Sequence, residues 1–326
     1  MTRAIVLAGG FGTRMAPLTA HRPKHLLEVA GEPFLAHQLR WLAGHGVDVA
    51  VLATYYRAEL FEPVFGPGSD VGLDLRYAVE PEPLGTGGAL AHAIAALPET
   101  APEDPIVVVN GDHFTRHDLG AQLAVLAGAP EADAVLLLRT VADATAYGSV
   151  VADAGGIVSA FVEKSPDPPS QEVNGGTYVL RRRVIDAIGP GVVCLEREVL
   201  PRLVAAGGVR AYREQADWID VGTPAALVLT SAQIVRSRGL ERIIGAGATV
   251  DPSAIVDGGS VIGADAHVGA GAAVHGCVLM PGASVGAGAR VRASVLGRGA
   301  VLGPGAALEA GVLGDAERFP PATTAE

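Results

Sequence analysis

The chain has 326 residues, 49% of them hydrophobic, with a formal net charge of −11 and two cysteines, Cys194 and Cys277. The negative charge argues against nucleic acids and anionic membranes as partners, and no apolar run approaches the roughly 18 residues that a membrane-spanning helix needs. The cysteines lie far apart, which supports neither a disulfide framework nor a zinc site. Because the N-terminus lacks a signal-peptide pattern, we expect a cytoplasmic protein with one large α/β domain and one smaller domain.

Apolar runs and helical patterns alternate over residues 1–140, which is typical of a parallel sheet with crossover helices. We expect strands at residues 4–7, 47–53, 73–79, 106–109 and 134–138, and a helix over residues 33–44. In open α/β sheets, ligands bind beyond the carboxyl ends of the strands. Residues 9–14, 80–88 and 110–112 are therefore expected at one rim of the sheet.

Shorter strands and turns follow from residue 147. We expect a hairpin of residues 147–151 and 157–162 around the turn Asp153-Ala154-Gly155-Gly156. Two more strands are expected at residues 177–180 and 209–212, and helices at residues 182–188, 195–206 and 224–238. The last helix closes the first domain, which we assign to residues 1–238.

Aliphatic residues recur every six positions from Ile244 to Val274, and after one slip near residues 280–283 the register resumes from Val285 to Leu308. Several of them are followed by glycine. This hexad is typical of a parallel β-helix, in which each six-residue side of a triangular coil turns one aliphatic side chain inward. We expect about four coils in a second domain of residues 239–326. A homo-oligomer is also expected, because a second copy commonly covers such faces and ends.

The first strand runs into three glycines, Gly9, Gly10 and Gly12, which are followed by Arg14 and Lys24. Glycine lets backbone N–H groups approach an anion closely. Arg14 offers a planar fork for phosphate oxygens, and Lys24 offers a compact charge. The loop lacks the third glycine of a dinucleotide-binding loop and the Gly-Lys-Ser/Thr of a P-loop. It predicts a phosphate site of another kind.

Lys24 and Lys164 are the two lysines of the chain, and every other residue in its total of 24 lysines and arginines is arginine. A chain that uses arginine elsewhere but keeps lysine at two positions indicates that an ammonium group is needed there. Both lysines therefore belong to the candidate site.

The pattern G-G-x-G-T-R-x-x-P-L-T, from Gly9 to Thr19, followed by Pro23-Lys24, resembles the signature of sugar-1-phosphate nucleotidylyltransferases. The hexad tail makes the chain most similar to the mannose-1-phosphate guanylyltransferase branch. The resemblance covers residues 3 to about 235. It implies a Rossmann-like mixed α/β sheet followed by a short left-handed parallel β-helix. It also implies a nucleoside triphosphate and a sugar 1-phosphate as substrates, with Mg²⁺ as cofactor.

The resemblance also implies where the nucleotide binds. The expected nucleotide-binding residues are Leu7, Ala8, Gly9, Gly10, Gly12, Thr13, Glu80, Gly85 and Thr86. The carboxylate of Glu80 can accept two hydrogen bonds, which matches the adjacent N1–H and N2–H₂ donors of guanine and favours GTP. The N-terminus of the helix expected at residues 89–97 would also favour an anion or the nucleotide. In the alternative interpretation, Glu80 is a strand-end acid that caps Gly87 or Gly88.

For the other substrate, the resemblance implies a site that holds the sugar and its phosphate. The expected sugar-phosphate-binding residues are Tyr147, Gly148, Glu163, Lys164 and Asn174. These segments could equally be ordinary turns, and Glu163 and Lys164 a surface pair. Adjacent residues of a strand point in opposite directions, so these two are not expected to pair with each other.

The implied metal site consists of Asp112 and Asp220, which would share one Mg²⁺ with the phosphates of both substrates. Spacing alone would not bring the two acids together. As strand-end residues, both could instead be turn formers. The catalytic residues would be Arg14, Lys24 and Lys164, with Arg14 and Lys24 on the triphosphate and Lys164 on the incoming phosphate.

The expected reaction is nucleotidyl transfer to a sugar 1-phosphate, with release of pyrophosphate. A phosphate monoester is already mostly a dianion at pH 7 and needs no general base, so catalysis would consist of alignment and charge neutralisation. Thymidylyl or adenylyl transfer to glucose 1-phosphate and guanylyl transfer to a heptose or cyclitol phosphate remain open. A non-catalytic regulatory subunit remains open as well, and the short tail disfavours an acetyltransferase.

Overall fold

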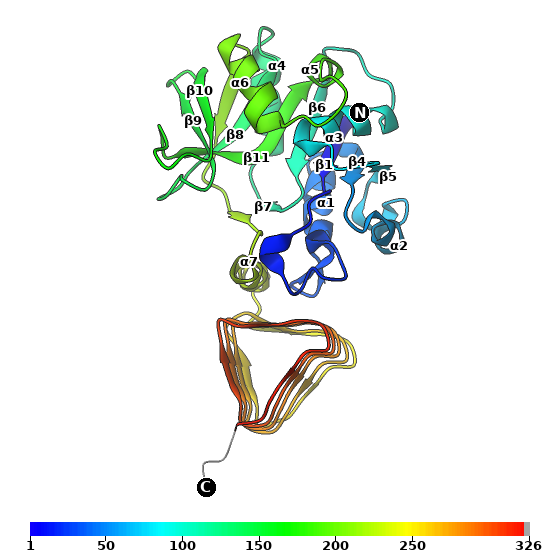
Figure 1. Ribbon diagram of the computed structural model, residues 1–326, viewed down its shortest axis with the longest axis vertical. Coiled ribbons are helices and arrows are strands. Elements are labelled where there is room, and N and C mark those ends of the chain that lie inside the picture. Colours follow the sequence, from blue (N-terminus) through cyan, green and yellow to red (C-terminus); the bar gives the residue numbers. More distant parts are fainter. Residues whose placement is uncertain (323–326) are drawn as a thin grey trace. The chain divides into compact units, whose positions relative to one another are not determined.

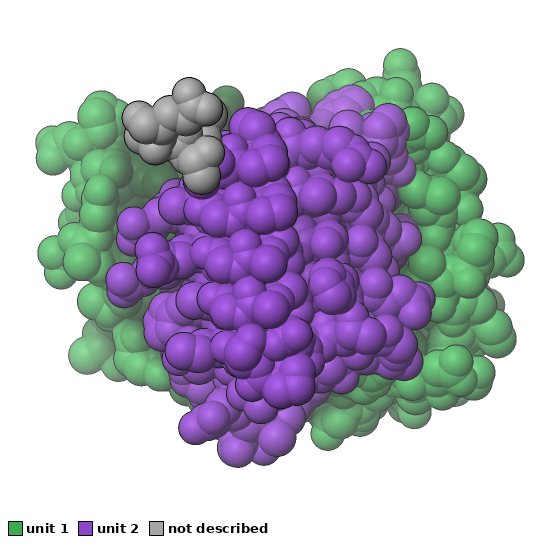
Figure 2. Space-filling view, turned by 90° about the horizontal axis from the view of Figure 1, so that it is seen from below, with its two compact units in different colours: residues 1–10, 36–218 green, residues 11–35, 219–326 purple. Residues whose placement is uncertain are grey.

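The computed structural model describes residues 1–322, which form two compact units, coloured separately in Figure 2. Unit 1 consists of residues 1–10 and 36–218, and unit 2 consists of residues 11–35 and the chain from residue 219 onward. These units divide the chain differently from the boundary after residue 238 that the sequence suggests. In the described chain, no helix has both the length and the apolar character needed to cross a membrane.

Unit 1 is built on a mixed sheet (Figure 1), which has nine strands in the described chain. Its strands are β1 (Thr2–Leu7), β4 (Val47–Thr54), β5 (Asp74–Val79), β6 (Pro105–Asn110), β8 (Ala134–Thr140), β9 (Gly148–Ala152), β10 (Val158–Glu163), β11 (Glu172–Arg181) and β12 (Val209–Arg213). The strands β6, β1, β4 and β5 lie side by side and run parallel. β9 and β10 form the expected antiparallel hairpin.

The strand β8 does not join the parallel group, although the alternating pattern suggests it. β11, from later in the chain, lies between β6 and β8 and runs antiparallel to both. Its inner eight residues are all buried. A long buried strand of this kind completes the sheet from a distant part of the sequence.

The main core of unit 1 packs one face of this sheet against helices. The helices of the unit are α2 (Glu62–Phe65), α3 (Gly85–Ala93), α4 (Leu119–Gly128), α5 (Arg182–Asp186) and α6 (Leu200–Ala205), and α1 (Phe34–Gly44) begins at the end of the segment that belongs to unit 2. Ile5 and Val108 from the strands pack with Leu90 of α3 in one buried cluster, which also includes Leu200 of α6. α4 is absent from the sequence-based expectations. The helix expected at residues 195–206 is a π-helical turn, Leu195–Val199, that leads into α6.

Unit 2 contains three parallel sheets of short strands that form the sides of a triangle in Figure 1. The first sheet holds β14 (Arg242–Ile244), β17 (Ser260–Ile262), β20 (Val278–Leu279), β23 (Val295–Leu296) and β26 (Val312–Leu313). The second holds β15 (Thr249–Val250), β18 (His267–Val268), β21 (Ser284–Val285), β24 (Val301–Leu302) and β27 (Arg318–Phe319). The third holds β16 (Ile255–Asp257), β19 (Ala273–His275), β22 (Arg290–Arg292) and β25 (Ala307–Glu309). These sheets are consistent with the expected β-helix.

The coils of this β-helix do not keep a strict hexad. Ile244 pairs with Ile262, 18 residues later, but Ile262 pairs with Leu279 and Leu279 with Leu296, each 17 residues later. The single slip inferred from the sequence is therefore wrong, because one residue is lost in every later coil. In the later coils, the shortened side is the one between the third sheet and the first, where Val274 and Leu279, and then Val291 and Leu296, are five residues apart.

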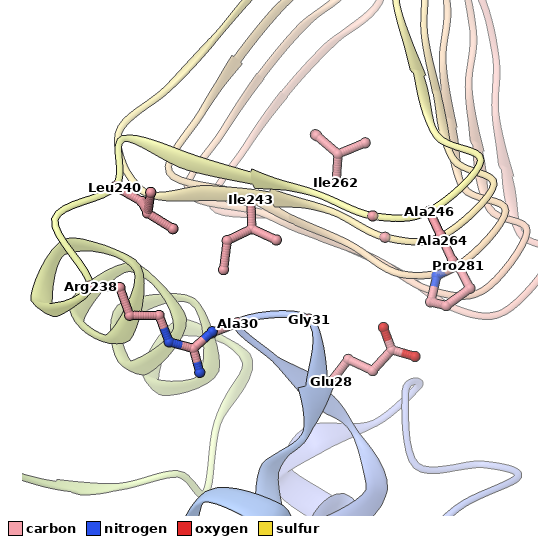
Figure 3. A pocket seen from close by; sticks show the side chains of 12 residues that line it. Glu28, Ala30, Gly31, Arg238, Leu240, Ile243, Ala246, Ile262, Ala264 and Pro281 are labelled. Atoms are coloured by element: carbon pink, nitrogen blue, oxygen red, sulfur yellow. The ribbon is translucent and has the colours of Figure 1, made fainter.

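Unit 2 also contains helix α7 (Pro224–Ser237) and the hairpin of β2 (Glu28–Val29) and β3 (Glu32–Pro33). A cleft of about 470 Å³ lies between this hairpin, the end of α7 and the first coils (Figure 3). Arg238 and Glu28, which line the cleft, already form ion pairs, with Glu32 at 3.0 Å and with Arg298 at 3.2 Å. Two further short strands, β7 (His113–Thr115) and β13 (Trp218–Asp220), complete the strands of the described residues.

Candidate active site

Three strand ends of unit 1 meet where the sequence predicts a ligand-binding rim. The backbone N–H of Gly111, after β6, donates to the carbonyl of Leu7 at 2.9 Å. Ala8, after β1, donates to Ala53 at 2.8 Å, and Glu80, after β5, donates to Thr54 at 2.8 Å. The ends of β1, β5 and β6 are thus tied to neighbouring strands, and the side chains that follow them share one edge of the sheet.

Gly9 and Glu80 are in contact at this edge. A Cβ atom at position 9 would lie 2.7 Å from Oε1 of Glu80, so only glycine leaves room for the carboxylate. Oε2 of Glu80 accepts a hydrogen bond from the Leu84 N–H at 3.0 Å, so it caps neither Gly87 nor Gly88. The side chain is buried, and this burial raises the pKa of the Glu80 carboxyl. Glu80 does accept a backbone N–H near the start of the helix, but from Leu84 and not from Gly87 or Gly88. Its other oxygen, Oε1, lies beside Gly9 of the glycine loop.

Helix α3 begins at Gly85, four residues earlier than expected, and its first N–H groups are used by the protein. The N–H groups of Gly87 and Gly88 both donate to the carbonyl of Val193, at 2.9 and 3.2 Å. Gly85 has φ +71°, and a Cβ atom there would lie 2.6 Å from the same carbonyl oxygen. The expectation that this helix N-terminus receives an anion is therefore wrong for these two groups. The glycines allow the segment at Val193 to approach the helix.

Thr86 and Asn174 are the two ends of one chain of hydrogen bonds, which is buried except at Thr86. The hydroxyl of Thr86 donates to Oε2 of Glu196 at 2.6 Å and accepts from the Leu195 N–H at 2.8 Å. Oε1 of Glu196 accepts from the Tyr178 hydroxyl at 3.2 Å, which in turn accepts from the Asn174 amide at 2.7 Å. Burial, with the nearby Glu196 carboxylate, raises the pKa of Tyr178. The chain links a residue expected at the nucleotide to one expected at the sugar.

Sequence reasoning missed Glu196 altogether. It lies in the π-helical turn, inside a stretch that reads as an ordinary helix, and it is buried. A buried glutamate needs polar partners, but the burial and the partners of Glu196 come from tertiary contacts, so no local pattern singles it out.

Tyr147, Gly148, Glu163 and Lys164 lie together, as expected. A Cβ atom at position 148 would lie 2.8 Å from Oε2 of Glu163, so glycine makes room for this carboxylate too. The Lys164 N–H donates to the carbonyl of Tyr147 at 3.1 Å. Burial raises the pKa of the Glu163 carboxyl, and Lys164 opposes this shift. The Tyr147 ring packs edge-on against Trp218 at 5.6 Å between ring centroids.

Glu163 and Lys164 do pair, contrary to the expectation for neighbours on a strand. Nζ of Lys164 lies 3.5 Å from Oε1 of Glu163. β10 ends at Glu163, and Lys164 has φ +49°, in the left-handed region. This conformation turns the lysine out of the strand alternation. It is uncommon for a residue other than glycine, and such strain concentrates at functional sites.

Asp112 follows β6, next to a cluster of rings that the sequence did not indicate. Oδ1 of Asp112 lies 3.6 Å from Nε2 of His113, and the His113 ring contacts that of Trp218 at 5.3 Å between centroids. The Trp218 indole N–H donates to the Gly175 carbonyl at 2.8 Å, which is also 3.0 Å from Nδ1 of His113. These contacts hold the loop after Asn174 against the end of β6.

The cationic part of the glycine loop belongs to unit 2. Gly12 has φ +65°, and the hydroxyl of Thr19 donates to its carbonyl at 3.0 Å. A Cβ atom at position 12 would lie 3.2 Å from Cβ of Lys24, so the loop folds back onto the lysine. Thr13 begins a 3₁₀ turn, Thr13–Met15, and Gly10 is exposed with open space around it.

Arg14 and Asp220 are also brought together in unit 2. Nη2 of Arg14 lies 3.6 Å from Oδ2 of Asp220, and a side chain at Gly222 would collide with the guanidinium. Oδ1 of Asp220 is buried and has no hydrogen-bond partner among residues 1–322. A buried carboxylate oxygen without a donor is costly, and a hard cation would satisfy it. The residue thus fits a role as ligand to Mg²⁺.

Comparisons with known proteins agree with these features. The Nucleotidyl transferase family model matches residues 3–237, and the GMPPB C-terminal domain model matches residues 240–321. A mannose-1-phosphate guanylyltransferase of Mycobacterium tuberculosis is 41% identical over 86% of this chain and 80% of its own length. A mannose-1-phosphate guanyltransferase of Schizosaccharomyces pombe is 35% identical over 68% of this chain and 61% of its own length.

Solved structures show the same relationship. The structure of HddC from Yersinia pseudotuberculosis complexed with GMP-PN matches with a TM-score of 0.61 and 27% identity, over 72% of this chain and 100% of that one. A putative glucose-1-phosphate thymidylyltransferase from Bacillus anthracis, 22% identical with a TM-score of 0.65 over 72% of this chain and 95% of that one, shares the fold. With both parts of the chain matched and the glycine loop in place, the protein belongs to the nucleotidyl transferase family.

Proposed function

We propose that the chain is a mannose-1-phosphate guanylyltransferase, which joins GMP from GTP to mannose 1-phosphate and releases pyrophosphate. The observation that carries this proposal is the buried carboxylate of Glu80, held against Gly9 at the end of the glycine loop. The named activity of the Mycobacterium tuberculosis relative supports the same sugar and base. The GMP-PN bound to HddC supports a guanine nucleotide.

Guanine fits the acceptor that Glu80 presents. Its N1–H and N2–H₂ are adjacent donors, and a carboxylate accepts hydrogen bonds at both oxygens. Oε2 already accepts from Leu84, but each carboxylate oxygen has two lone pairs and can accept a second bond. Thymine and uracil offer one ring donor beside acceptors, and therefore leave part of this acceptor unused.

In the proposed reaction, an oxygen of the sugar phosphate forms a bond to the α-phosphorus of GTP. The bond from that phosphorus to the bridging oxygen breaks on the opposite side, and pyrophosphate leaves with the electron pair. No general base is needed, because the sugar phosphate is mostly a dianion at neutral pH. Arg14 and Lys24 bind the triphosphate, and Lys164 binds the sugar phosphate.

We assign the Mg²⁺ ligands to Asp112 and Asp220. The buried Oδ1 of Asp220, which has no donor in the described chain, supports this assignment. When bound, the ion would neutralise charge on the phosphates of the two substrates. Asp112 and Asp220 would otherwise repel the approaching phosphates, so Arg14, beside Asp220, also screens that carboxylate.

Sugar recognition is assigned to the residues around Gly148 and Glu163. The carboxylate of Glu163 can accept hydrogen bonds from sugar hydroxyls, and the small Gly148 keeps it accessible. Asn174 has its amide N–H₂ on Tyr178 and its Oδ1 on the Gly176 N–H. We therefore assign Asn174 a role in holding the backbone near the sugar site, because both ends of its amide already have hydrogen-bond partners.

The test is release of pyrophosphate with GTP, dTTP, ATP and UTP, each paired with mannose 1-phosphate and glucose 1-phosphate in the presence of Mg²⁺. We expect GTP with mannose 1-phosphate to be the best pair. Turnover of GTP with neither sugar would redirect the search to heptose or cyclitol phosphates. No release with any pair would contradict an enzymatic role and favour a regulatory subunit.

A further inference from the structure

The segment that carries Arg14 and Lys24 belongs to the same compact unit as the β-helix. The chain leaves unit 1 after Gly10, runs through residues 11–35 in unit 2, and then returns. A loop usually takes its position from the strands that flank it. In this protein, the contacts that hold residues 11–35 within unit 2 come from residues more than 200 positions later in the sequence.

The first of these contacts is an ion pair between Arg22 and Asp315. Asp315 lies in the turn between β26 and β27, and both side chains are largely buried, with 12% and 19% exposed. The other carboxylate oxygen of Asp315 accepts the backbone N–H of Arg298 at 2.9 Å, which fixes it on the coil. Nη1 of Arg22 also lies 3.8 Å from the sulfur of Met280, on an earlier coil.

The second contact is an ion pair between Glu28 and Arg298. Nη2 of Arg298 lies 3.2 Å from Oε1 of Glu28, whose side chain is 14% exposed. Burial raises the pKa of Glu28, and the Arg298 charge opposes this. Burial and the neighbouring Arg298 lower the pKa of Arg22, while Asp315 and Glu28 oppose that shift. Arg22, Asp315, Arg298 and Glu28 are therefore one alternating cluster of charges.

Two neutral contacts support the cluster. The backbone N–H of Ala30 donates to the hydroxyl of Ser231, in α7, at 2.9 Å. A Cβ atom at Gly314 would lie 3.1 Å from the ring of Pro17, so the last coils touch the segment between Arg14 and Lys24 closely. The segment is thus in contact with unit 2 before Lys24, at Pro17 and Arg22, and after it, at Glu28 and Ala30.

We propose that the last coils of the β-helix position the triphosphate-binding groups of the enzyme, with Asp315 and Arg298 as positioning residues that act through Arg22 and Glu28. This inference rests on the proposed binding of GTP by Arg14 and Lys24. A buried charge that loses its partner is strongly destabilised. Without Asp315, we expect the Arg22 side chain to move toward water and the backbone at Arg22 to shift with it. Arg22 stands two residues before Lys24, and a shift there displaces the lysine.

The test measures GTP binding and catalysis in parallel, in the full-length chain with Mg²⁺. Asp315→Asn keeps the shape of the side chain and removes its charge. We expect it to weaken GTP binding in titration calorimetry by about tenfold, because only part of the cost of breaking the buried pair reaches the GTP site, and to raise KM for GTP by a similar factor. KM for mannose 1-phosphate should change less than about twofold.

Asp257→Asn is the matched control, since Asp257 forms an exposed pair with His275 at 2.6 Å on another face of the same β-helix. It should bind GTP as the wild type does. Arg298→Gln, at a half-exposed residue, serves as the milder second variant if Asp315→Asn does not fold. Arg22→Lys should retain more affinity than Arg22→Gln, because it keeps the charge.

The outcomes separate the two proposals. Unchanged GTP affinity in both Asp315→Asn and Arg298→Gln overturns the positioning role, whatever the wild-type activity. Equal losses for GTP and mannose 1-phosphate also overturn it, because they indicate general destabilisation. A wild type that binds GTP but releases no pyrophosphate refutes the proposed function, and its variants still test the positioning role through binding.

Discussion

Glu80 shows how the role of one residue depends on its neighbours. The sequence suggests either a base-binding acid or a helix cap, and the structure shows a carboxylate that caps Leu84 through one oxygen and faces Gly9 with the other. The two functions are compatible because a carboxylate has more than one acceptor position. The choice of cap partner could not be inferred from sequence, since it depends on where the turn before α3 places its N–H groups.

Replacement of Glu80 by Gln should reduce the preference for GTP over dTTP and UTP by about 10- to 100-fold, the value of one or two hydrogen bonds. The amide offers only one acceptor oxygen to the two donors of guanine. The measurement is the ratio of kcat/KM among the three nucleotides. Glu82→Gln, at an exposed position nearby, is the matched control and should leave the ratio unchanged.

The pH dependence follows from the same residue. Burial raises the pKa of Glu80. As pH is lowered, Glu80 should therefore be protonated, and GTP affinity should fall, at a pH above the usual carboxyl range. The folded state binds this proton more tightly than the unfolded state, so the contribution of Glu80 to stability is fully present at low pH and is lost as pH rises through the raised pKa. GTP affinity that is flat with pH in the wild type would contradict a base-binding role.

At the scale of elements, the strands were predictable and several helix boundaries were not. The apolar runs of β1, β4 and β6 are nearly continuous, because both faces of a parallel sheet are covered. β5, at the end of the strand order, mixes polar and apolar residues. The start of α3 was missed because three of its first four residues are glycine, a poor helix former. Two N–H groups of its first turn donate to the carbonyl of Val193. That contact is tertiary and leaves no trace in local sequence.

The site was predictable to the extent that its residues lie in short motifs. The glycine loop, Glu163-Lys164 and Asn110-Gly111-Asp112 could be found by pattern. Glu196 and Trp218 could not be assigned, because their roles arise from hydrogen bonds with distant segments. The insertion of β11 between β6 and β8 was invisible for the same reason.

Replacement of Glu196 by Gln should raise KM for both substrates and lower the free energy of unfolding by about 1–3 kcal/mol. An amide cannot accept from Thr86 and Tyr178 at both positions, so one donor is left unsatisfied in a buried site. Steady-state kinetics and urea unfolding measure the two effects. Glu198→Gln is the control, since Glu198 accepts the Cys194 N–H at 2.7 Å and does not belong to the chain from Thr86 to Asn174. A Glu196→Gln variant with only one KM raised would refute the link between the two substrate sites.

At the scale of the whole molecule, the first coil of the β-helix exposes aliphatic side chains. Ile244 is 43% exposed, whereas Ile262 and Leu279, at the same position of later coils, are fully buried. Ile255 on the same coil is 63% exposed. Exposed aliphatic residues on the first coil favour a covering partner, which is the reason to test the homo-oligomer expected from the sequence.

Replacement of Ile255 by Glu should therefore convert the protein to a smaller species in sedimentation velocity. A charged side chain at the centre of an apolar contact is costly to bury. Leu229→Glu, at an aliphatic residue of α7 that is 55% exposed, should leave the assembly unchanged. A wild type that sediments as a monomer would contradict self-association.

The two lysines lie in different units, Lys24 in unit 2 and Lys164 in unit 1. Among the 326 residues, no other side chain carries a primary amine that an acylating reagent can modify. After brief acylation, mass spectrometry measures the extent of modification of each lysine, and therefore reports on each substrate site separately. GTP should protect Lys24, and mannose 1-phosphate should protect Lys164, whose side chain is 60% exposed. Protection of neither lysine by its ligand would remove both from the substrate sites, and the N-terminal amine serves as the internal reference for reagent exposure.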